Sequence, residues 1–183
     1  MQKVLNDVVL HTEKFSKSGG LSCPSGCHLC CLKKDISATP LEFLPLAYHL
    51  FRNGQAEAFY DRLEQLPNDN LCSLFSALGQ TNGGCSQYRF RGLICRLFGY
   101  SANLDKQSQT RLVTCKTIKE SESYRQLKPA QLTKAPKATD YYMRLAAIDF
   151  SLANEHRQIN EAIRRALEIV MTYYQYRARR RRA

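Results

Sequence analysis

The chain has 183 residues, 44% of them hydrophobic and 23% charged, with a formal net charge of +11 at pH 7. This length and balance predict a single domain, residues 1–183, with an apolar core. No apolar run approaches the roughly 20 residues that span a bilayer, which excludes a membrane-spanning protein. The first residues carry Asp7 and Glu13 instead of the apolar core of a secretion signal, so we expect a cytoplasmic location, where thiols stay reduced.

Three helices are predicted in the first part of the chain. Residues 2–16 carry apolar side chains at helical spacing, and "SKSGG" ends this pattern. A second helix starts at a capping box formed by Thr39 and Glu42 and ends at Gly54. A third helix follows in "QAEAFYDRLEQLP" and ends at Pro67.

The rest of the chain mixes loop and helix. Residues 72–100 hold three cysteines and a Gly-Gly turn, and they predict loop or short strand with a little helix. A helical pattern returns after residue 139, with apolar side chains at three- and four-residue steps from Ile159 onward. We therefore expect a mainly α fold, a small helical domain wrapped around a cysteine-rich, metal-stabilised loop centre. Its expected parts are a metal-binding part, a polar linker, a C-terminal helical part and an Arg-rich tail, at residues 1–118, 119–138, 139–176 and 177–183.

Four cysteines, Cys23, Cys27, Cys30 and Cys31, fall within "CPSGCHLCC". Thiolates are soft ligands that select zinc, copper(I) or iron–sulfur clusters, and C-x-x-C spacing is common in such sites. Adjacent side chains diverge in a strand and lie about 100° apart in a helix, so Cys30 and Cys31 bind one zinc ion only with difficulty. This pair favours a polynuclear centre or two sites. The first three cysteines also have the spacing of radical S-adenosylmethionine enzymes, but the strand–helix alternation of their barrel is missing.

The other four cysteines are spread along the chain. A single free cysteine is most simply a small buried hydrophobic residue, and Cys72 in "LCSLF" fits such a core position. Cys85 and Cys95 lie in a loop-like segment and look more like ligands, whereas Cys115 is intermediate. Eight cysteines in a reduced compartment, half of them in nine residues, are hard to explain by packing. All eight are therefore candidate metal ligands.

The order of three segments carries a resemblance to a known family. "CPSGCHLCC", "TPLEFLPLA" and "CSLF…GGCSQYRFRGLICRLFG" follow one another over about residues 20–100. The pattern resembles the CxxCxxCC cysteine-cluster family, also called the YkgJ family, which implies a zinc- or iron-chelating domain. Three features differ from the family pattern: the first cysteine gap is three residues, Phe75 stands where leucine is usual, and Arg91-Gly92 replaces an Arg-Pro pair. The later matching positions are Cys72, Cys85, Tyr88, Arg91, Cys95 and Arg96.

Polar residues near the cysteines have an expected role around the metal. An arginine beside thiolates can donate hydrogen bonds to sulfur and offset the negative charge of a cluster. We expect Tyr88, Arg91 and Arg96 to surround the centre in this way. His28 lies inside the cluster, where it is more typical of a bystander or a donor to sulfur than of a zinc ligand.

Two metal hypotheses follow from these residues. In the first, the cysteines of a cytoplasmic protein hold an iron–sulfur cluster, whose role is redox or accessory to a modification reaction. In the second, zinc stabilises a small binding module. No serine–histidine–acid arrangement and no phosphate loop is found, so no catalytic residue is assigned.

A third hypothesis concerns the basic C-terminus, "YRARRRRA". Tyrosines next to arginines can stack on bases while phosphates are held, which favours RNA as a partner; another protein is the other macromolecule considered. The alternative is a solvated tail without a partner. The candidate residues for nucleic-acid binding are Arg177, Arg179, Arg180, Arg181 and Arg182.

Overall fold

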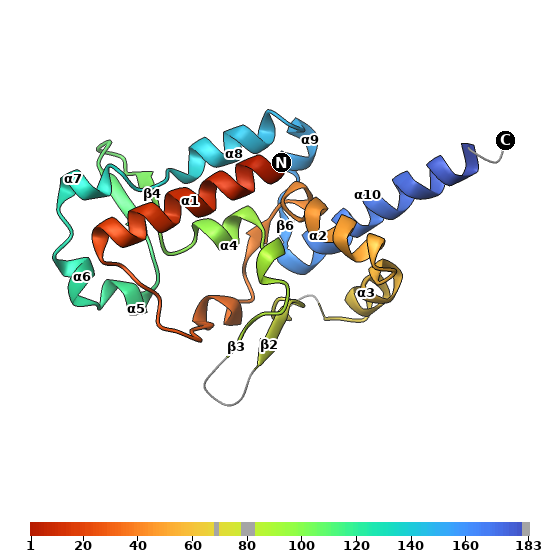
Figure 1. Ribbon diagram of the computed structural model, residues 1–183, viewed down its shortest axis with the longest axis horizontal. Helices are drawn as coiled ribbons and strands as arrows, with labels where there is room; N and C mark the ends of the chain where they lie inside the picture. Colours follow the sequence, from red (N-terminus) through yellow and green to blue (C-terminus); the bar gives the residue numbers. More distant parts are fainter. Residues whose placement is uncertain (68–69, 78–82, 181–183) are drawn as a thin grey trace.

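The structure is a computed structural model that describes residues 1–67, 70–77 and 83–180 (Figure 1). The prediction of a mainly α fold is confirmed, and the cysteines of residues 23–31 lie in a loop region. The helices are α1 Gln2–Gly19, α2 Pro40–Arg52, α3 Ala56–Glu64, α4 Leu93–Leu97, α5 Lys116–Lys119, α6 Glu122–Arg125, α7 Pro129–Leu132, α8 Ala138–Ala146, α9 Phe150–Asn154 and α10 Ile159–Arg180, with short 3-10 turns η1 Leu29–Leu32 and η2 Tyr88–Phe90.

Three small antiparallel pairs of strands connect these helices. They are β1 Ser37–Ala38 with β6 Arg157–Gln158, β2 Phe75–Ala77 with β3 Gly83–Cys85, and β4 Ser101–Leu104 with β5 Thr110–Val113. In the first pair, Ser37 stands opposite Gln158, so the segment after η1 is held next to the start of α10. In the second pair, Phe75 stands opposite Cys85.

The capping box that starts α2 is confirmed. One carboxylate oxygen of Glu42 accepts hydrogen bonds from the backbone N–H (3.0 Å) and the hydroxyl (3.1 Å) of Thr39. The other oxygen accepts the backbone N–H of Ile94 at 2.8 Å. Glu42 is completely buried, and its carboxylate therefore joins the start of α2 to the start of α4.

The apolar core has three connected parts. The largest lies between α2, α3 and α10, and includes Phe43, Leu46 and Ile163. A second lies beneath α1, α4 and α8, and α1 runs beside α8 in Figure 1. The third is lined by Phe15, which α1 supplies near its end, and by residues of β4, β5 and α5. Each fully buried Leu or Phe side chain contributes about 1.5–3 kcal/mol relative to an exposed one, so burial of these helix faces stabilises the fold.

Residues 119–138, which we expected to form a polar linker, contain helices. All of α6 and α7 falls in this segment, and Pro129 occupies the first turn of α7. Its apolar residues Tyr124, Leu127 and Leu132 pack on the third part of the core, and Ala135 is buried there. The polar composition hid these contacts, because a few apolar side chains suffice to anchor short helices.

The helical pattern predicted after residue 139 is interrupted. Helix α8 ends at Ala146, and a new N-cap at Asp149 starts α9, where the Asp149 carboxylate accepts the N–H of Leu152 at 2.9 Å. Strand β6 then precedes α10. Without glycine or proline at these breaks, residue periodicity alone gave no stop signal.

The C-terminal part of α10 extends away from the body of the protein (Figure 1). Tyr173 and Tyr176 are exposed there, and Arg177 donates a hydrogen bond to the Tyr173 hydroxyl at 2.9 Å. Arg181 and Arg182 lie outside the described residues, as do the side chains of Arg179 and Arg180. Of the helices described, none is both long and apolar enough to cross a membrane.

Candidate metal centre

The eight cysteines come from six separate parts of the chain. Two lie in the loop between α1 and η1, two in η1, and one each before β2, in β3, in α4 and directly before α5; in this order they are Cys23, Cys27, Cys30, Cys31, Cys72, Cys85, Cys95 and Cys115. All eight are free thiols. Because these parts are far apart in the sequence, any site that they share depends on the tertiary fold.

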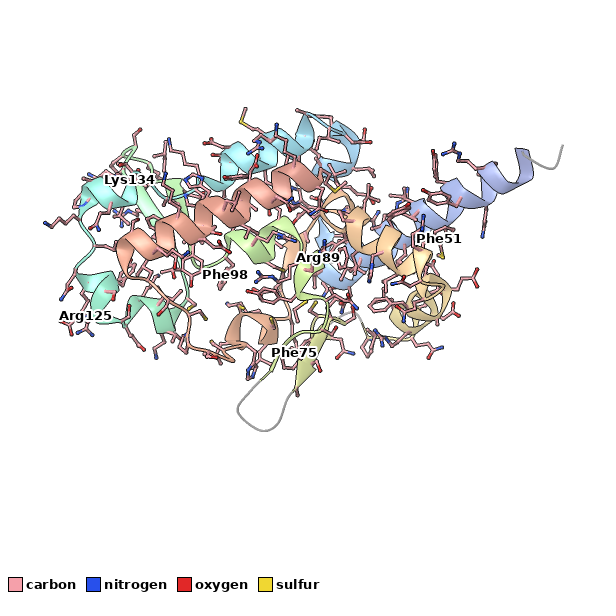
Figure 2. The ribbon with its side chains drawn as sticks, in the orientation of Figure 1. Phe51, Phe75, Arg89, Phe98, Arg125 and Lys134 are labelled. Atoms are coloured by element: carbon pink, nitrogen blue, oxygen red, sulfur yellow. The ribbon has the colours of Figure 1, made fainter. Side chains whose placement is uncertain are left out.

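Five of the cysteines line one cavity of about 320 Å³. Most of the remaining lining is apolar, and it includes Phe75 and Phe98, which are both labelled in Figure 2. The guanidinium-bearing Arg91 also lines this cavity. The cysteines of the cavity are Cys30, Cys31, Cys72, Cys85 and Cys95.

The adjacent pair lies in the turn η1. The two sulfur atoms of Cys30 and Cys31 are 3.9 Å apart. A hydrogen bond from the Cys31 thiol lowers the pKa of Cys30 to about 6, and the same bond raises the pKa of Cys31 above its ordinary range. Near neutral pH the pair therefore holds one thiolate and one proton, which is an effective start for binding a soft metal.

Neighbouring thiols divide the cysteines into two groups. The first, called the cavity group, is Cys31, Cys72, Cys85 and Cys95: the charges of Cys95 and Cys72 act on Cys31, and those of Cys72 and Cys85 act on Cys95. The second, called the loop group, is Cys23, Cys27, Cys30 and Cys115. Partial burial and a hydrogen bond with Cys27 raise the pKa of Cys23 to about 12, and the other thiols next to it include Cys115 and Cys30. The two groups meet at the Cys30–Cys31 peptide.

Burial keeps the deeper thiols protonated. It raises the pKa of Cys72 to about 11 and raises that of Cys95 further. Within the residues that the structure describes, no three His, Cys, Asp or Glu side chains are already close enough to hold one ion. Metal binding must therefore draw sulfurs together and release their protons. The donor set suits this, because it consists of soft sulfur ligands in the numbers that zinc and iron–sulfur sites use.

A comparison with protein families agrees with this geometry. Residues 22–116, just over half of the chain, match the family model CxxCxxCC, described as "Putative zinc- or iron-chelating domain". The chain belongs to the CxxCxxCC family. The match confirms the resemblance seen in the sequence, includes all eight cysteines and supports metal binding as the general role. No curated protein and no solved structure gives a significant match.

The Arg91-Gly92 turn, where this member of the CxxCxxCC family departs from the Arg-Pro pattern, keeps a geometry that proline could adopt. Gly92 has φ −61°, and Arg91 before it is extended at φ −55° and ψ 140°. A Cβ atom at Gly92, however, would lie 2.8 Å from Cζ of Phe43. The glycine therefore provides room for the Phe43 ring rather than an unusual backbone conformation.

Tyr88, Arg91 and Arg96, which we expected to surround the metal centre, lie differently with respect to the cysteines of this CxxCxxCC protein. The Arg91 guanidinium lies 3.5 Å from the centre of the Tyr88 ring and donates to the Tyr88 carbonyl at 3.2 Å. Burial raises the pKa of Cys85, and the charge of Arg91 opposes this rise. Tyr88 itself is exposed and supports Arg91. Arg96 does not line the cysteine cavity, and it donates to the carbonyls of Arg91 (2.8 Å) and Arg89 (2.6 Å). The centres of the His28 and Phe75 rings lie 5.4 Å apart, so the two rings pack against each other.

Sequence reasoning missed two residues that shape the site of this CxxCxxCC protein. Glu42 was recognised only as a helix cap, yet it also binds the backbone at the start of α4, the helix that carries Cys95. Burial raises the pKa of this carboxyl. Phe43 lines the cavity and covers Gly92. Both residues follow the predicted cap directly, but no local pattern relates them to a segment about fifty positions away.

Proposed function

We propose that this CxxCxxCC protein acts in the cytoplasm and holds an iron–sulfur cluster in the cysteine-lined cavity, where the cluster transfers electrons or assists a modification reaction. The cavity carries this proposal. Its volume of about 320 Å³ lies at the lower end of the roughly 300–1,000 Å³ of ligand-sized cavities. A single zinc ion bound directly by four thiolates would leave most of this space empty. A cluster of several iron and sulfide atoms fills more of it with the same four cysteines.

The surroundings of the cavity support the same proposal. Five cysteines line the cavity, and the four of the cavity group match the usual number of ligands for one cluster. Arg91 supplies a positive charge beside them, and hydrogen bonds and charge near the sulfurs set cluster potentials. The wall also includes the apolar side chains of Phe43, Phe75 and Phe98, and apolar surroundings tune the potential of a bound centre.

Metal and sulfide analysis of protein purified without oxygen tests this proposal. Iron and acid-labile sulfide in matching amounts are expected, with a brown colour that dithionite bleaches. Cys95→Ser removes a cavity ligand and should lose the cluster. Ser73→Ala, next to Cys72, is the matched control because it changes a buried side chain without removing a thiol, and it should keep the cluster. A colourless protein that is fully loaded with zinc would contradict the proposal.

Structural zinc is the second candidate, and one distance favours it. Zn–S bonds of about 2.3 Å place two sulfurs of a tetrahedral site about 3.8 Å apart. The sulfurs of Cys30 and Cys31 are already 3.9 Å apart. In this case the purified protein contains zinc without sulfide, and replacement by cobalt(II) gives the absorption bands of a tetrahedral thiolate site.

RNA association is a separate proposal, supported by the exposed end of α10. Tyr176 and Arg177 project there from a helix that extends beyond the body of the protein. Binding of single-stranded RNA should weaken steeply with added salt, because arginines displace counterions from phosphates. A chain that ends at Tyr176 should lose this binding. Equal affinity of the shortened and the full chain would contradict a role of the tail.

A further inference from the structure

A second cavity of about 230 Å³ lies next to the cysteine-lined cavity. Helix α1 provides one wall, and residues 88–100 provide the other. The two cavities share Arg91, Cys95 and Phe98, so they adjoin at these three side chains. Phe98 is labelled in Figure 2, below α4.

The second cavity contains a buried positive charge without a carboxylate partner. Arg96 lines it and is only 9% exposed. Two of the five N–H groups of its guanidinium donate to the carbonyls of Arg89 and Arg91. Over the described ranges of the chain, no Asp or Glu forms an ion pair with Arg96.

Cys95 lines both cavities and directly precedes Arg96 in the chain. Arg91 also lines both cavities, whereas Arg96 lines the second cavity alone. A buried charge that lacks a partner is strongly unfavourable, and native proteins pair such groups. An anion that enters the second cavity from solution would give the guanidinium of Arg96 a partner that no carboxylate of the described residues supplies.

We propose that the cavity between α1 and residues 88–100 binds a small anion, whose carboxylate or phosphate group is held by the guanidinium groups of Arg96 and Arg91. The planar fork of arginine matches the two oxygens of either group. Three hydroxyl-bearing residues complete the wall, Thr12, Ser16 and Tyr100. The volume is below the roughly 300–1,000 Å³ of drug-sized sites, so the ligand is small. This site does not depend on which metal the cysteines bind.

Glu13 modifies the site from its rim. Its side chain lines the cavity but is exposed to solvent. Its carboxylate therefore repels an entering anion from the rim of the cavity. The arrangement allows a test by variants that raise as well as lower affinity. Arg96→Gln removes the buried charge, whereas Glu13→Gln removes the repulsion.

The experiment titrates the full, metal-loaded chain with inorganic phosphate and, separately, with acetate, at constant ionic strength set by chloride. Calorimetry should show saturable binding of at least one of them, and Arg96→Gln should raise the Kd about tenfold or more. Tighter phosphate binding assigns a phosphate ligand, and tighter acetate binding assigns a carboxylate. If neither probe binds in the presence of chloride, the proposal is wrong.

Arg96 also donates hydrogen bonds to the turn at residues 89–91, so Arg96→Gln can disrupt the fold as well as the anion site. A second pair of variants, which leaves this turn intact, tests the anion site separately. Glu13→Gln should lower the Kd roughly two- to fivefold, since one repulsive charge at the rim is removed. Glu57→Gln on α3 makes the same change on an exposed side chain outside this cavity and should leave the Kd unchanged. Equal Kd values for these two variants would overturn the placement of the anion in this cavity.

Discussion

The sulfur atoms of Cys30 and Cys31 lie 3.9 Å apart in one 3-10 turn, yet the two side chains have different thiol neighbours. Cys31 lies near Cys95 and Cys72, whereas Cys30 also lies near Cys23. That an adjacent cysteine pair marks a polynuclear centre or two sites stays a prediction, which the different thiol neighbours of the two residues support. In this interpretation Cys23 and Cys27, in the loop before η1, belong to the second site.

The first prediction concerns this division into two groups. Cys115→Ser should remove only the metal held by the loop group, and Cys95→Ser only the metal held by the cavity group, because their nearest thiols differ. The measurement is metal per chain by mass spectrometry on the folded variants. The double variant should lose all metal. If either single change alone removes all metal, the eight cysteines form one centre.

The second prediction concerns the contact between Gly92 and Phe43. Gly92→Pro keeps the backbone angles but places Cβ 2.8 Å from Cζ of Phe43, so it should lower the free energy of unfolding by about 1–3 kcal/mol. In a Phe43→Leu background the same change should be much less costly. A double-mutant cycle by urea denaturation gives the coupling, expected at about 1 kcal/mol or more. If the two changes have additive effects on the free energy of unfolding, the Phe43 ring moves away from the substituted residue 92 at no cost.

The third prediction concerns the buried carboxyl of Glu42. Its pKa is raised in the folded state by burial, so the folded chain holds this proton at pH values where the unfolded chain has lost it. The stabilisation is therefore complete below the ordinary glutamate pKa, about 4.3, and is lost as pH rises through the folded value. Compared with Glu42→Gln, the protein should lose stability with rising pH over this window. The difference in unfolding free energy between the two proteins, both metal-loaded, isolates this effect; a constant difference would contradict it.

The fourth prediction concerns a buried hydroxyl. The Ser73 hydroxyl has no hydrogen-bond partner in the structure, although the backbone N–H of Ser73 donates to Asn160 at 2.8 Å. Ser73→Ala removes the unpaired group and keeps the backbone bond, so it should raise the unfolding free energy by about 1 kcal/mol. Ser73→Cys places a different polar group at the same position and serves as comparison. A loss of stability in Ser73→Ala would mean that the hydroxyl has a partner.

Local patterns predicted the elements that local interactions determine. The cap at Thr39 and Glu42 and the stop after Arg52 follow from residues a few positions apart, and both appear in the structure. The breaks around Asp149 and the short helices α6 and α7 depend instead on packing against distant residues. The breaks around Asp149 also lack the glycine or proline that marks a boundary.

The candidate site shows the same limit. The sequence indicated which residue type binds metal, but it could not show that Cys72, Cys85 and Cys95 share a cavity, because their contacts are made by the tertiary fold. Cys72 illustrates this: its apolar neighbours predicted a core position, and it does pack against the core, yet it also lines the cavity. A cysteine at the border between the apolar core and the candidate site fits both the pattern of a core residue and that of a metal ligand.

The pairing of β1 with β6 has a consequence for folding during synthesis. The carbonyl of Ile36 accepts the N–H of Ile159 at 2.9 Å, so the segment after the cysteine turn is fastened to the first residue of α10. During synthesis the family domain, residues 22–116, is complete long before this fastening can form. A nascent chain without α10 lacks the partner of Ile36, so this strand pair cannot yet hold the segment that follows η1. The final position of the Cys30–Cys31 turn therefore depends on a segment that is synthesised after the whole family domain.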